Sequence, residues 1–428
     1  MLIKEIYNIW ENSTGVSTDT RADVEGSLFF ALSGENFDGN KFAEKAIRDG
    51  AIAAVIDKKP FKRSNKYIFV DDCLHTLQEL ARYHREKLGT PILAITGSNG
   101  KTTSKELISA VLSTEKNATS TKGNLNNHIG VPLSLLQIKE ETEIAIIEMG
   151  ANHPGEIKSL CDIATPNFGI ITNIGKAHLE GFGSFEGIVN AKNELYDSLK
   201  SSKGKIILNA DDKLLVSLAG DIKAFTYGTK NSDITGKILS HKPYLNIEWA
   251  YKGHIYLINS QLYGQYNFTN IMASIACGIF FGISPKSICK AIEGYKAGNK
   301  RSQIIKTKEN TIILDAYNAN PVSMLNAINS FKSFDAEKPV LILGDMFELG
   351  SEAEKEHRSI IGLLRKANFR DVYLVGSEFY KYSGNNMFDF FESTSELKSF
   401  LANNKIKAKT ILIKGSRGMR LEDLLETL

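Results

Sequence analysis

A short glycine-bearing turn between an apolar run and an amphipathic segment constrains the fold of this chain more than any other feature. The segment ILAITGSNGKTTSKELISAVL spans residues 92–112. Residues 92–95 predict a buried strand, and residues 104–112 predict a helix because their apolar side chains recur at helical spacing. Glycine lets the turn at residues 97–102 curl until successive backbone N–H groups face inward toward an anion. The chain therefore places an anion-binding turn between a strand and a helix.

The side chains of this turn favour a nucleoside triphosphate as the anion. The N-terminus of the following helix adds the positive end of its dipole. Lys101 can reach the terminal phosphates, and the Thr102 hydroxyl can bind magnesium. An ordinary glycine-rich turn is the alternative, and the Lys-Thr-Thr sequence at the helix start disfavours it. Only Ser98 and Asn99 separate the two glycines, whereas the common phosphate loop has four residues there. The usual kinases and GTPases therefore fit less well.

Composition and charge indicate an ordinary globular protein. The length of 428 residues predicts about three domains. Apolar residues make up 42% of the chain and charged residues 24%, as in globular proteins generally. A formal net charge of +3 is too small to indicate binding to nucleic acid or to an anionic membrane.

The sequence also predicts a cytoplasmic location. Its four cysteines contain no CxxC pair and no dense cluster, which favours a reducing compartment. The first residues, MLIKEIYNIW, lack the apolar core and small-residue cleavage site of a signal peptide. The longest mostly apolar stretch, residues 271–283, is too short to cross a bilayer and predicts a buried helix. We therefore expect no membrane insertion.

Element patterns divide the chain into three blocks, residues 1–86, 87–299 and 300–428. Strands alternate with helices in the second and third blocks, which predicts parallel sheets with helices on both faces. The predicted fold class is α/β with three domains: a small N-terminal α/β domain, a central parallel-sheet ATPase domain built on the phosphate loop, and a Rossmann-like C-terminal domain. The expected strands are residues 27–32, 51–57, 66–70, 92–96, 144–149, 168–174, 205–209, 311–317, 339–346, 371–376 and 410–416. Helices are expected near residues 40–49 and 74–87.

Polar residues follow the predicted strands of the central block. In parallel sheets, ligands bind beyond the carboxyl ends of the strands. Glu148 closes one strand opposite the phosphate loop, where a magnesium ligand would lie; a solvated glutamate at a strand end is the alternative. Asn173 and His178 follow the next strand, although a lone histidine is more often structural. Asp211 follows the fourth.

Other candidates rest on weaker patterns. Lys192 and Glu194 would lie on a helix, where spacing alone favours a solvated face. Asn267 and Asn270 are three residues apart on one helical face, where their amides could bind an adenine edge or cap the helix. The strand ends of the third block carry a further polar set: Asp315, Tyr317, Asn318, Asn320, Asp345, Glu348, Lys414 and Arg417. The last two lie in a turn suited to anions.

Taken in order, these segments resemble the Mur ligase family of peptidoglycan synthesis, and the resemblance covers essentially the whole chain. GSNGKTT, TKGNLNNHIGVPLSLL, EMGANHPGEI, TNIGKAHLEGFGS and AKNELY are similar to the central ATPase domain of the family. STDTRADVEGSLFFALSGENFDG is similar to a uridine-nucleotide-binding domain that two of its members share. Asn40, the next residue, departs from the family, which often has histidine there.

Two segments favour one branch of the family. DAYNANPVSM and LGDMFELG resemble the ligase that joins D-alanyl-D-alanine to UDP-N-acetylmuramoyl-tripeptide. The DNPR sequence that is frequent in the ligase for a dibasic third residue does not occur in this chain. The implied reaction uses ATP to convert the terminal carboxylate of the tripeptide to an acyl phosphate, which the dipeptide amine attacks. The expected products are UDP-N-acetylmuramoyl-pentapeptide, ADP and phosphate, and we expect a monomer.

The resemblance also implies roles for individual residues. The implied catalytic residues are Lys101, Glu148, His178 and Lys192. Two magnesium ions would be held by Thr102, Glu148, His178 and Lys192, the last as a carbamate. The implied ATP-binding residues are Gly97, Ser98, Asn99, Gly100, Lys101, Thr102, Thr103, Asn270, Arg301, Asp315 and Asn318. The implied substrate-binding residues are Thr20, Arg21, Asn126, Asn127, Lys414 and Arg417.

The three domains would then bind the uridine nucleotide, ATP and the dipeptide, and closure would exclude water from the acyl phosphate. Two alternatives stay open. One is another superfamily member, such as the tripeptide-forming ligase or a folylpolyglutamate synthetase. The other is a nucleotide-dependent binding or switch protein that forms no bond. The third residue of the tripeptide, lysine or diaminopimelate, is undetermined.

Overall fold

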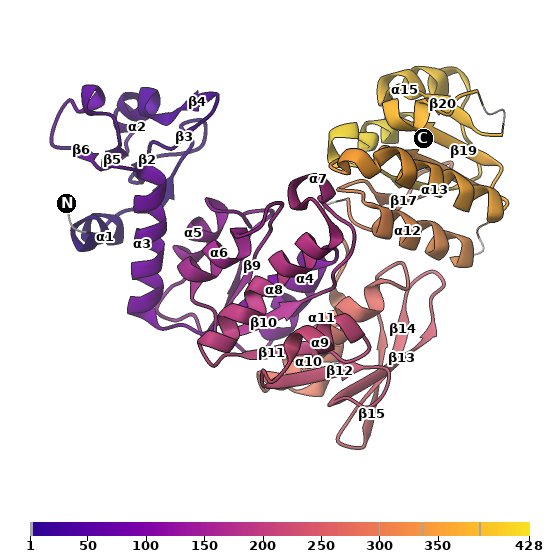
Figure 1. Ribbon diagram of the computed structural model, residues 1–428, viewed down its shortest axis with the longest axis horizontal. Helices are drawn as coiled ribbons and strands as arrows, with labels where there is room; N and C mark the ends of the chain where they lie inside the picture. Colours follow the sequence, from indigo (N-terminus) through magenta and orange to yellow (C-terminus); the bar gives the residue numbers. More distant parts are fainter. Residues whose placement is uncertain (1–2, 299, 335, 337, 385–386) are drawn as a thin grey trace.

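The computed structural model, which describes residues 3–298, 300–334, 336, 338–384 and 387–428, contains three α/β domains in chain order (Figure 1). The N-terminal and C-terminal domains lie on opposite sides of the central domain. Their main sheets have four, nine and six strands in chain order. The predicted fold class is confirmed. Residue 299, the predicted end of the central block, lies outside the described residues, and the predicted boundaries stay predictions.

The N-terminal domain is built on a parallel sheet with the strand order β1-β2-β5-β6. The strands predicted at residues 27–32, 51–57 and 66–70 are confirmed as β2, β5 and β6, and each is two or three residues shorter than predicted. Two short strands, β3 and β4, pair separately. The elements are α1 (Ile3–Glu11), β1 (Val16–Ser17), β2 (Leu28–Phe30), β3 (Ser33–Gly34), β4 (Phe37–Asp38), η1 (Gly39–Phe42), α2 (Ala43–Arg48), β5 (Ala53–Ile56), η2 (Lys59–Phe61), β6 (Tyr67–Phe69) and α3 (Cys73–Leu88).

Asn40 is a structural residue of this domain. Its side chain is buried, and its Nδ2 donates to Asp57 Oδ1 at 2.8 Å and to Asp38 Oδ1 at 3.0 Å. Its Oδ1 accepts from the Asp57 N–H at 3.1 Å. The amide therefore ties η1 to the end of β5, which a side chain with both a donor and an acceptor can do.

Helix α3 connects the N-terminal domain to the central domain. Asp72 caps its first turn, and Gly89 ends it in the left-handed conformation. The buried ring of His84 lies between the domains: Nδ1 is 3.1 Å from the Tyr7 hydroxyl, and Nε2 is 2.8 Å from the carbonyl oxygen of Ile138. Because this helix contacts elements of both domains, it holds them in a defined orientation.

The central sheet has the order β15-β14-β13-β12-β11-β10-β7-β9-β8, and seven of its strands, β7 to β13, run parallel. The strands predicted at residues 92–96 and 205–209 match β7 and β11 at both ends. The strands are β7 (Ile92–Thr96), β8 (Ala118–Ser120), β9 (Ile144–Glu148), β10 (Phe168–Ile171), β11 (Lys205–Asn209), β12 (Ala224–Gly228), β13 (Ile234–Ser240), β14 (Asn246–Tyr251) and β15 (His254–Asn259). The helices are α4 (Lys101–Leu112), α5 (Gly130–Leu135), α6 (Glu156–Ala164), α7 (Leu179–Phe182), α8 (Phe185–Ser201), α9 (Lys213–Ala219), α10 (Asn267–Phe280) and α11 (Pro285–Gly294).

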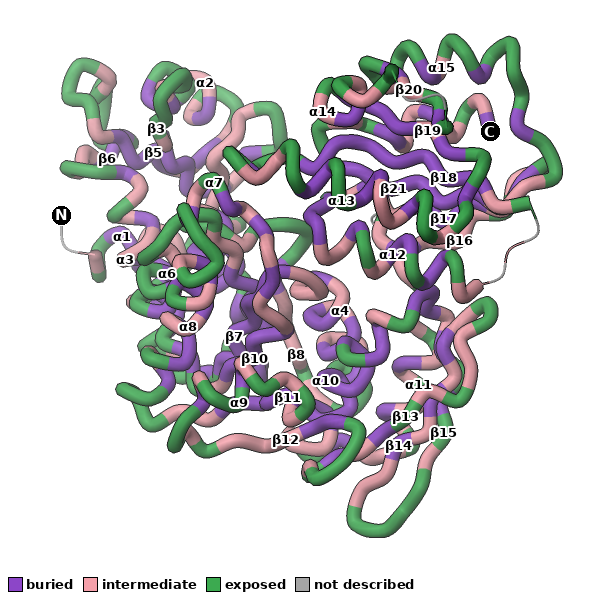
Figure 2. Tube along the Cα trace, turned by 45° about the vertical axis from the view of Figure 1, so that its right-hand side comes forward, coloured by how far each residue is buried: buried purple, intermediate pink, exposed green. Residues whose placement is uncertain are grey.

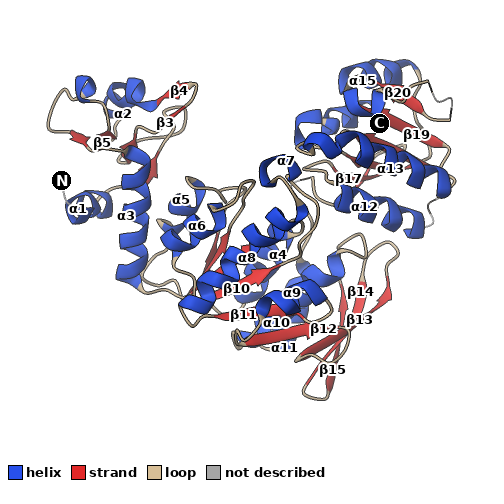
Figure 3. Cartoon of the chain, viewed as in Figure 1, coloured by secondary structure: helices blue, strands red, loops and turns tan. Residues whose placement is uncertain are grey.

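Helices cover both faces of the central and C-terminal sheets (Figure 3). Every residue of β7 is buried, and successive side chains enter opposite cores. Ile92 and Ala94 pack in the core that includes α6 and α8, whereas Leu93 and Ile95 pack against α4 and α10. A strand covered on both faces reads as a continuous apolar run, which is why it could be predicted.

The antiparallel end of the central sheet was not predicted. Strands β14 and β15 pair antiparallel and extend the parallel sheet. The two residues that join them, Lys252 and Gly253, have φ values of +48° and +81°, as in a two-residue hairpin turn. This Lys-Gly pair was the available sequence signal. The strands themselves are partly exposed, so they lack the apolar runs that marked the buried strands.

The C-terminal sheet has the order β16-β17-β21-β18-β19-β20, with only β16 antiparallel among the described strands. Its inner strands form a continuous buried layer (Figure 2). The four predicted strands are confirmed as β17, β18, β19 and β21, whereas β16 and β20 were not predicted. The elements are β16 (Gln303–Lys306), β17 (Thr311–Asp315), α12 (Pro321–Phe334), β18 (Pro339–Gly344), η3 (Gly350–Glu352), α13 (Ala353–Lys366), β19 (Asp371–Val375), α14 (Ser377–Tyr380), β20 (Asp389–Phe391), α15 (Thr394–Asn403), β21 (Thr410–Lys414), η4 (Arg417–Met419) and η5 (Leu421–Thr427).

Among the described residues, no helix has the length and apolar character needed to span a bilayer. The apolar stretch at residues 271–283 belongs largely to the buried helix α10, as predicted. Its Ser274 is fully buried and donates to the carbonyl oxygen of Ile271 at 2.7 Å. The four cysteines are unpaired.

We expect Asn40→Ala to lower the free energy of unfolding of the N-terminal domain by about 2 kcal/mol, because the amide bonds two carboxylates in a buried setting. Urea unfolding followed by Trp10 fluorescence in a Trp249→Phe background measures this loss. Asn65→Ala, an exposed substitution in the same domain, is the control and should change stability by less than about 0.5 kcal/mol. Equal losses in the two variants would contradict the structural role of Asn40.

Candidate active site

A cavity of about 1290 Å³ lies between the central and C-terminal domains. It opens beyond the carboxyl ends of β7, β9 and β10, as the sequence predicted for a parallel sheet. Most of the residues proposed from the sequence line it. These are Ser98, Asn99, Gly100, Lys101, Thr102, Thr103, Asn126, Asn127, Glu148, His178, Asn270, Arg301, Asp315, Asn318 and Lys414.

The phosphate loop needs glycine at both of its ends. Gly97 has φ +145° and Gly100 has φ +78°. A Cβ at residue 97 would lie 2.0 Å from Thr172 Oγ1, and one at residue 100 would lie 2.5 Å from Asn270 Oδ1. Helix α4 begins directly after Gly100, three residues before the predicted start. Its first N–H groups have no acceptor within the helix, so they can bind an anion.

The end of β10 holds this loop in place. The Ser98 N–H donates to the carbonyl oxygen of Asn173 at 2.9 Å, and the Asn99 N–H donates to its Oδ1 at 3.0 Å. The Thr172 hydroxyl donates to the carbonyl oxygen of Asn99 at 2.6 Å. Strand β10 stops at Ile171, three residues earlier than predicted, because the following residues make these contacts.

The Lys101 side chain folds back over the phosphate loop. Its Nζ donates to the carbonyl oxygen of Gly97 at 2.6 Å and to that of Ser98 at 3.3 Å. Loss of solvent around the ammonium lowers the Lys101 pKa, and the charge of Glu148 partly offsets this effect. Neutral carbonyl oxygens therefore hold a cation whose position suits a phosphate.

Glu148 is a buried carboxylate beside the loop. Its Oε1 accepts from Asn126 Nδ2 at 2.7 Å and from the Thr102 hydroxyl at 3.2 Å. Its Oε2 is buried and has no hydrogen-bond partner, although Lys105 Nζ lies 3.9 Å away. An unpartnered carboxylate oxygen in a buried site is costly unless something binds it.

The Thr102 and Glu148 oxygens fit a magnesium ion. Magnesium prefers oxygen ligands and usually binds one or two carboxylates together with phosphates and water. The buried Oε2 of Glu148 and the adjacent hydroxyl supply such ligands at the phosphate-binding turn. Among the described residues, no three His, Cys, Asp or Glu side chains gather as a metal cluster.

Lys192 is buried. Its helical spacing favoured a position on a solvated face, and that prediction is wrong. Its side chain is 2% exposed, its Nζ donates to the carbonyl oxygen of Ala151 at 3.3 Å, and it lies 5.3 Å from the centroid of the Phe182 ring. Burial, aided by the charge of Lys101, lowers the Lys192 pKa to about 7. Burial therefore shifts this amine toward its neutral form.

Glu194 has a structural role instead. Its Oε1 accepts from the Gly155 N–H at 2.7 Å, and its Oε2 accepts from the Lys158 N–H at 2.8 Å. The carboxylate thus caps α6. Asn127 likewise caps α5, since its Oδ1 accepts from the Gly130 N–H at 2.9 Å. A substrate contact by Asn127 stays a prediction.

Asn267 and Asn270 join two helices beside the cavity. Asn270 Nδ2 donates to Asn267 Oδ1 at 2.8 Å, and the Ser104 hydroxyl of α4 donates to Asn270 Oδ1 at 3.1 Å. Asn267 Nδ2 donates to the carbonyl oxygen of Tyr263 at 2.8 Å. Both side chains line the cavity, and their hydrogen bonds attach α10 to the start of α4.

The C-terminal domain adds a buried ion pair to the cavity. Lys414 Nζ donates to Asp315 Oδ2 at 2.7 Å and to the carbonyl oxygen of Asn318 at 3.2 Å. Lys414 is 2% exposed. The two side chains come from the ends of adjacent parallel strands, β21 and β17. The sequence placed both at strand ends, and the sheet register pairs them.

Tyr317 lies against Arg301 and Arg417, two of the three arginines that the resemblance selected. The guanidinium carbon of Arg301 is 3.7 Å from the centroid of the Tyr317 ring, and that of Arg417 is 5.4 Å from it. Arg301 Nε is buried without a hydrogen-bond partner. The ring therefore orients a cation toward the cavity. Arg417 itself does not line the described cavity.

Polar side chains make contacts across the boundary between the central and C-terminal domains. Asn320 Nδ2 donates to Asn99 Oδ1 at 2.8 Å, so the phosphate loop itself contacts the C-terminal domain. Lys176 and Glu356 form an ion pair at 2.7 Å, and His178 Nδ1 hydrogen-bonds to Glu348 Oε2. The bond to His178 lowers the Glu348 pKa. The segment LGDMFELG contains two acidic residues, and they differ in role. Glu348 contacts the central domain, whereas Asp345 is buried.

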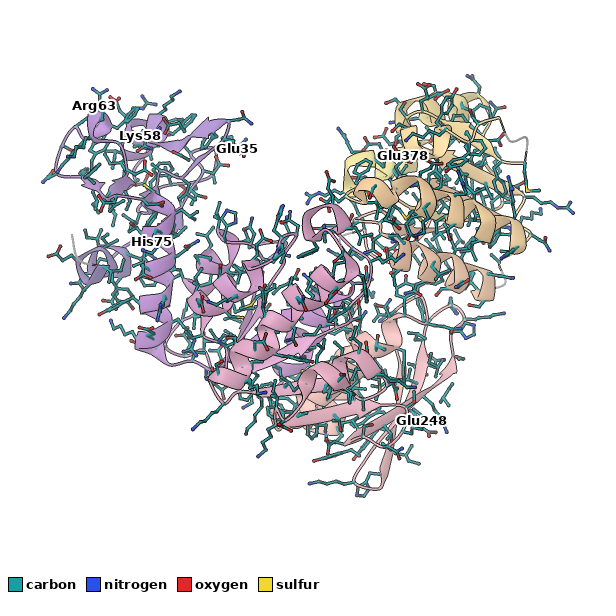
Figure 4. All side chains as sticks on the ribbon, viewed as in Figure 1. Glu35, Lys58, Arg63, His75, Glu248 and Glu378 are labelled. Carbon is teal, nitrogen blue, oxygen red and sulfur yellow. The ribbon has the colours of Figure 1, made fainter. Side chains whose placement is uncertain are left out.

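Asp345 is buried and caps α14. Its Oδ2 accepts from the Glu378 N–H at 2.9 Å and its Oδ1 from the Phe379 N–H at 3.0 Å. Glu378 is labelled in the C-terminal domain in Figure 4. Burial raises the Asp345 pKa, and these two N–H groups partly offset that. We assign Asp345 to the scaffold rather than to the cavity.

Thr20 and Arg21 lie in the N-terminal domain and do not line the cavity. Arg21 is exposed and pairs with Asp19 at 2.7 Å. Charged side chains of the same domain, such as Lys58 and Arg63, are labelled in Figure 4, far from the C-terminal domain. A substrate role for Thr20 and Arg21 stays a prediction.

Lys105 was missed by the sequence analysis. It is 3% exposed, its Nζ donates to the carbonyl oxygen of Thr121 at 2.8 Å, and it approaches Glu148. The sequence signal that could have identified it is its spacing on α4. Lys105 lies four residues after Lys101 and three before the buried Ile108, so all three share one helical face.

Three family models match successive parts of the chain. They are the Mur ligase family catalytic domain at residues 12–85, the Mur ligase middle domain at residues 95–278 and the Mur ligase glutamate ligase domain at residues 300–417. A curated relative, the UDP-N-acetylmuramoyl-tripeptide–D-alanyl-D-alanine ligase of Bacillus subtilis (strain 168), is 38% identical over 97% of this chain and 93% of the relative. The chain belongs to the Mur ligase family.

Solved Mur ligase structures agree with the whole fold. MurF from Acinetobacter baumannii matches with a TM-score of 0.87 and 30% identity, covering 96% of this chain and 92% of that one. MurF ligase from Thermotoga maritima in complex with ADP matches with a TM-score of 0.85 and 26% identity, covering 96% of each chain. The likeness therefore includes all three domains of this Mur ligase.

We expect Gly100→Ala to weaken ATP binding at least tenfold, about 1.4 kcal/mol, because its Cβ would displace Asn270 from the phosphate loop. Isothermal titration with ATP and magnesium measures the change. Gly253→Ala is the matched control: its φ of +81° is nearly the same, but its Cβ meets nothing within 4 Å. Similar losses of ATP affinity in both variants would contradict the steric explanation.

Proposed function

We propose that this Mur ligase joins D-alanyl-D-alanine to UDP-N-acetylmuramoyl-tripeptide at the expense of ATP, giving the pentapeptide, ADP and phosphate. One observation carries the proposal: a single cavity contains the phosphate loop of the central domain and the buried Lys414 of the C-terminal domain. The similarity to ligases of that name over 97% of this chain supports the choice of substrates. The reaction would supply a peptidoglycan precursor.

The chemistry explains why ATP is needed. A carboxylate is a poor acyl donor, because oxide would have to leave. A carboxylate oxygen of the tripeptide attacks the terminal phosphorus, and the bond to ADP breaks. The dipeptide amine then adds to the acyl carbon of the acyl phosphate. Phosphate leaves with the former carboxylate oxygen, and the nitrogen loses a proton to solvent as the amide forms.

The phosphate loop would bind and orient the nucleotide. The N–H groups at the start of α4 and the Lys101 ammonium offset the negative charge that moves during phosphoryl transfer. Lys101 would leave the carbonyl oxygens of Gly97 and Ser98 for phosphate oxygens. A charged acceptor forms the stronger hydrogen bond, so nucleotide binding favours this exchange.

Magnesium would bind at two places. Lys192 itself does not line the described cavity, but its Nζ donates to the carbonyl oxygen of Ala151, which does. Thr102 and Glu148 would hold one ion, and His178 and a modified Lys192 would hold the other. Bound magnesium would neutralise phosphate charge and polarise the group in transfer. The buried, unpartnered Oε2 of Glu148 supports the first place.

Lys192 would serve as a carbamate. A neutral amine adds to the carbon of carbon dioxide, an electron pair of one C=O bond moves to oxygen, and the nitrogen loses a proton to solvent. Lys192 suits this step because it is buried. Its Nζ makes a long hydrogen bond to a neutral carbonyl oxygen rather than an ion pair with a carboxylate. The product is an anionic oxygen ligand, which a lysine ammonium cannot be.

The other two substrates would approach from the outer domains. Lys414 and Arg417 suit the carboxylate of the dipeptide, and Thr20 and Arg21 suit the uridine nucleotide. The N-terminal domain lies on the side of the central domain away from the C-terminal domain (Figure 1), so we infer that it moves to close the site. We propose that the enzyme acts as a monomer in the cytoplasm, because one chain supplies the whole cavity and ATP is its energy source.

We expect ADP release to require both joining partners. Purified protein with ATP, magnesium and UDP-N-acetylmuramoyl-tripeptide should release ADP rapidly only when D-alanyl-D-alanine is added, with one amide formed for each ADP. A coupled ADP assay and mass spectrometry measure both products. Release supported equally by a single amino acid would favour another superfamily member. Binding of ATP without acceptor-dependent release would favour a switch protein.

We expect Lys192→Ala to reduce the ligation rate at least a hundredfold, since it removes an anionic ligand from the magnesium site. Added short-chain carboxylic acids should restore part of the activity by filling the same space. Lys200→Ala, on the exposed side of the same helix, is the control and should keep full activity. Full activity of Lys192→Ala at ordinary magnesium concentrations would overturn the carbamate role.

A further inference from the structure

His178 of the central domain and Glu348 of the C-terminal domain meet where α7 faces the loop before η3. His178 Nδ1 hydrogen-bonds to Glu348 Oε2. The backbones also meet, because the Glu180 N–H donates to the carbonyl oxygen of Glu348 at 3.2 Å. Side chain and main chain of Glu348 therefore hold the same segment of the central domain.

Both residues have an uncommon backbone conformation. His178 has φ +54° and Glu348 has φ +61°, in the left-handed region that residues with a Cβ seldom adopt. Such conformations persist where the surroundings hold them, and they cluster at functional sites. Here two of them bond to each other across a domain boundary, and His178 lines the cavity. The contact is therefore unlike an ordinary surface pair.

The bond determines which ring nitrogen of His178 is available. A carboxylate only accepts hydrogen bonds, so His178 Nδ1 must carry the hydrogen. In the neutral ring, Nε2 then has the lone pair, and none of the residues that the structure describes hydrogen-bonds to it. Histidines that bind a metal through one nitrogen commonly donate the other N–H to a carboxylate, which sets the ring orientation. For His178, Glu348 supplies this carboxylate.

We propose that Glu348 is a positioning residue that holds His178 as the Nδ1–H tautomer with Nε2 free for a divalent metal ion in the cavity. The C-terminal domain thereby completes a metal-binding side chain of the central domain, so the site is fully formed only when the two domains are docked. This inference rests on the proposed function in one respect, that His178 binds the second magnesium ion.

The same boundary offers a matched control. Lys176, two residues before His178, pairs with Glu356 at 2.7 Å. Glu356→Gln removes an ion pair between the same two domains without touching His178. Glu348→Gly removes the carboxylate and suits the backbone, since glycine adopts positive φ freely. Glu348→Gln keeps an acceptor oxygen and should be intermediate.

The first experiment reads the tautomer in the free protein. Histidine labelled with ¹⁵N gives separate signals for the two ring nitrogens, and the His178 signals are those lost in His178→Gln. We expect the Nδ1–H form in the wild type and in Glu356→Gln, and a mixture of tautomers in Glu348→Gly. A wild-type Nε2–H form, or an unchanged tautomer in Glu348→Gly, would overturn the inference.

The second experiment measures metal affinity. Manganese(II), a paramagnetic probe, is titrated into the protein with ADP present and followed by electron paramagnetic resonance. We expect Glu348→Gly to weaken manganese binding at the weaker site roughly ten- to hundredfold, Glu348→Gln to weaken it less, and Glu356→Gln to leave it nearly unchanged. Equal losses in Glu348→Gly and Glu356→Gln would mean that domain docking alone is responsible, which overturns the positioning role.

The two experiments separate this inference from the proposed function. A wild-type protein that shows the expected tautomer and manganese binding but forms no amide would refute the function and retain the role of Glu348. A wild-type protein that forms the amide, with tautomer and affinity unchanged in Glu348→Gly, would refute only the role of Glu348.

Discussion

The site depends on three lysine side chains that are buried with few carboxylates around them. Lys101 donates to two carbonyl oxygens and Lys192 to one, while Lys105 lies 3.9 Å from a single carboxylate, that of Glu148. Lost solvation lowers the pKa of Lys101 and Lys192. Cations in such a setting are favourable only when an anion accompanies them. A polyphosphate with its metal ions, and carbon dioxide captured by one amine, are ligands that would relieve this imbalance.

A second constraint is that the cavity belongs to two domains at once. Asn320 of the C-terminal domain bonds to Asn99 in the phosphate loop, and Glu348 bonds to His178. The central domain therefore does not by itself set the geometry of its nucleotide site. A cavity shared between two domains suits a ligase. The acid that is activated and the amine that attacks it bind separately and must then be brought together in one site. It also lets the docking of one domain control the chemistry in another.

The parts of this molecule that could be predicted are those that local rules govern. Strand β7 matched at both ends because two covered faces demand a continuous apolar run, and Glu148 was placed correctly at a strand end. The same rules failed where a distant element decides exposure. Lys192 has the spacing of a solvated face, yet α8 turns it inward to Ala151. The strands β14 and β15 were missed because each is partly exposed and lacks a continuous apolar run.

The sequence by itself determined the α/β class, the phosphate loop with its required glycines, and the polar residues at strand ends. Backbone chirality, side-chain period and motif spacing are properties of short segments, so they can be read without coordinates. Only the tertiary structure decided that Asn40 ties η1 to β5, that Glu194 caps a helix, and that Glu348 rather than Asp345 bonds to His178 of the central domain. Those outcomes depend on contacts between residues far apart in the chain, which exist only after the sheets, their registers and the domains have been packed together.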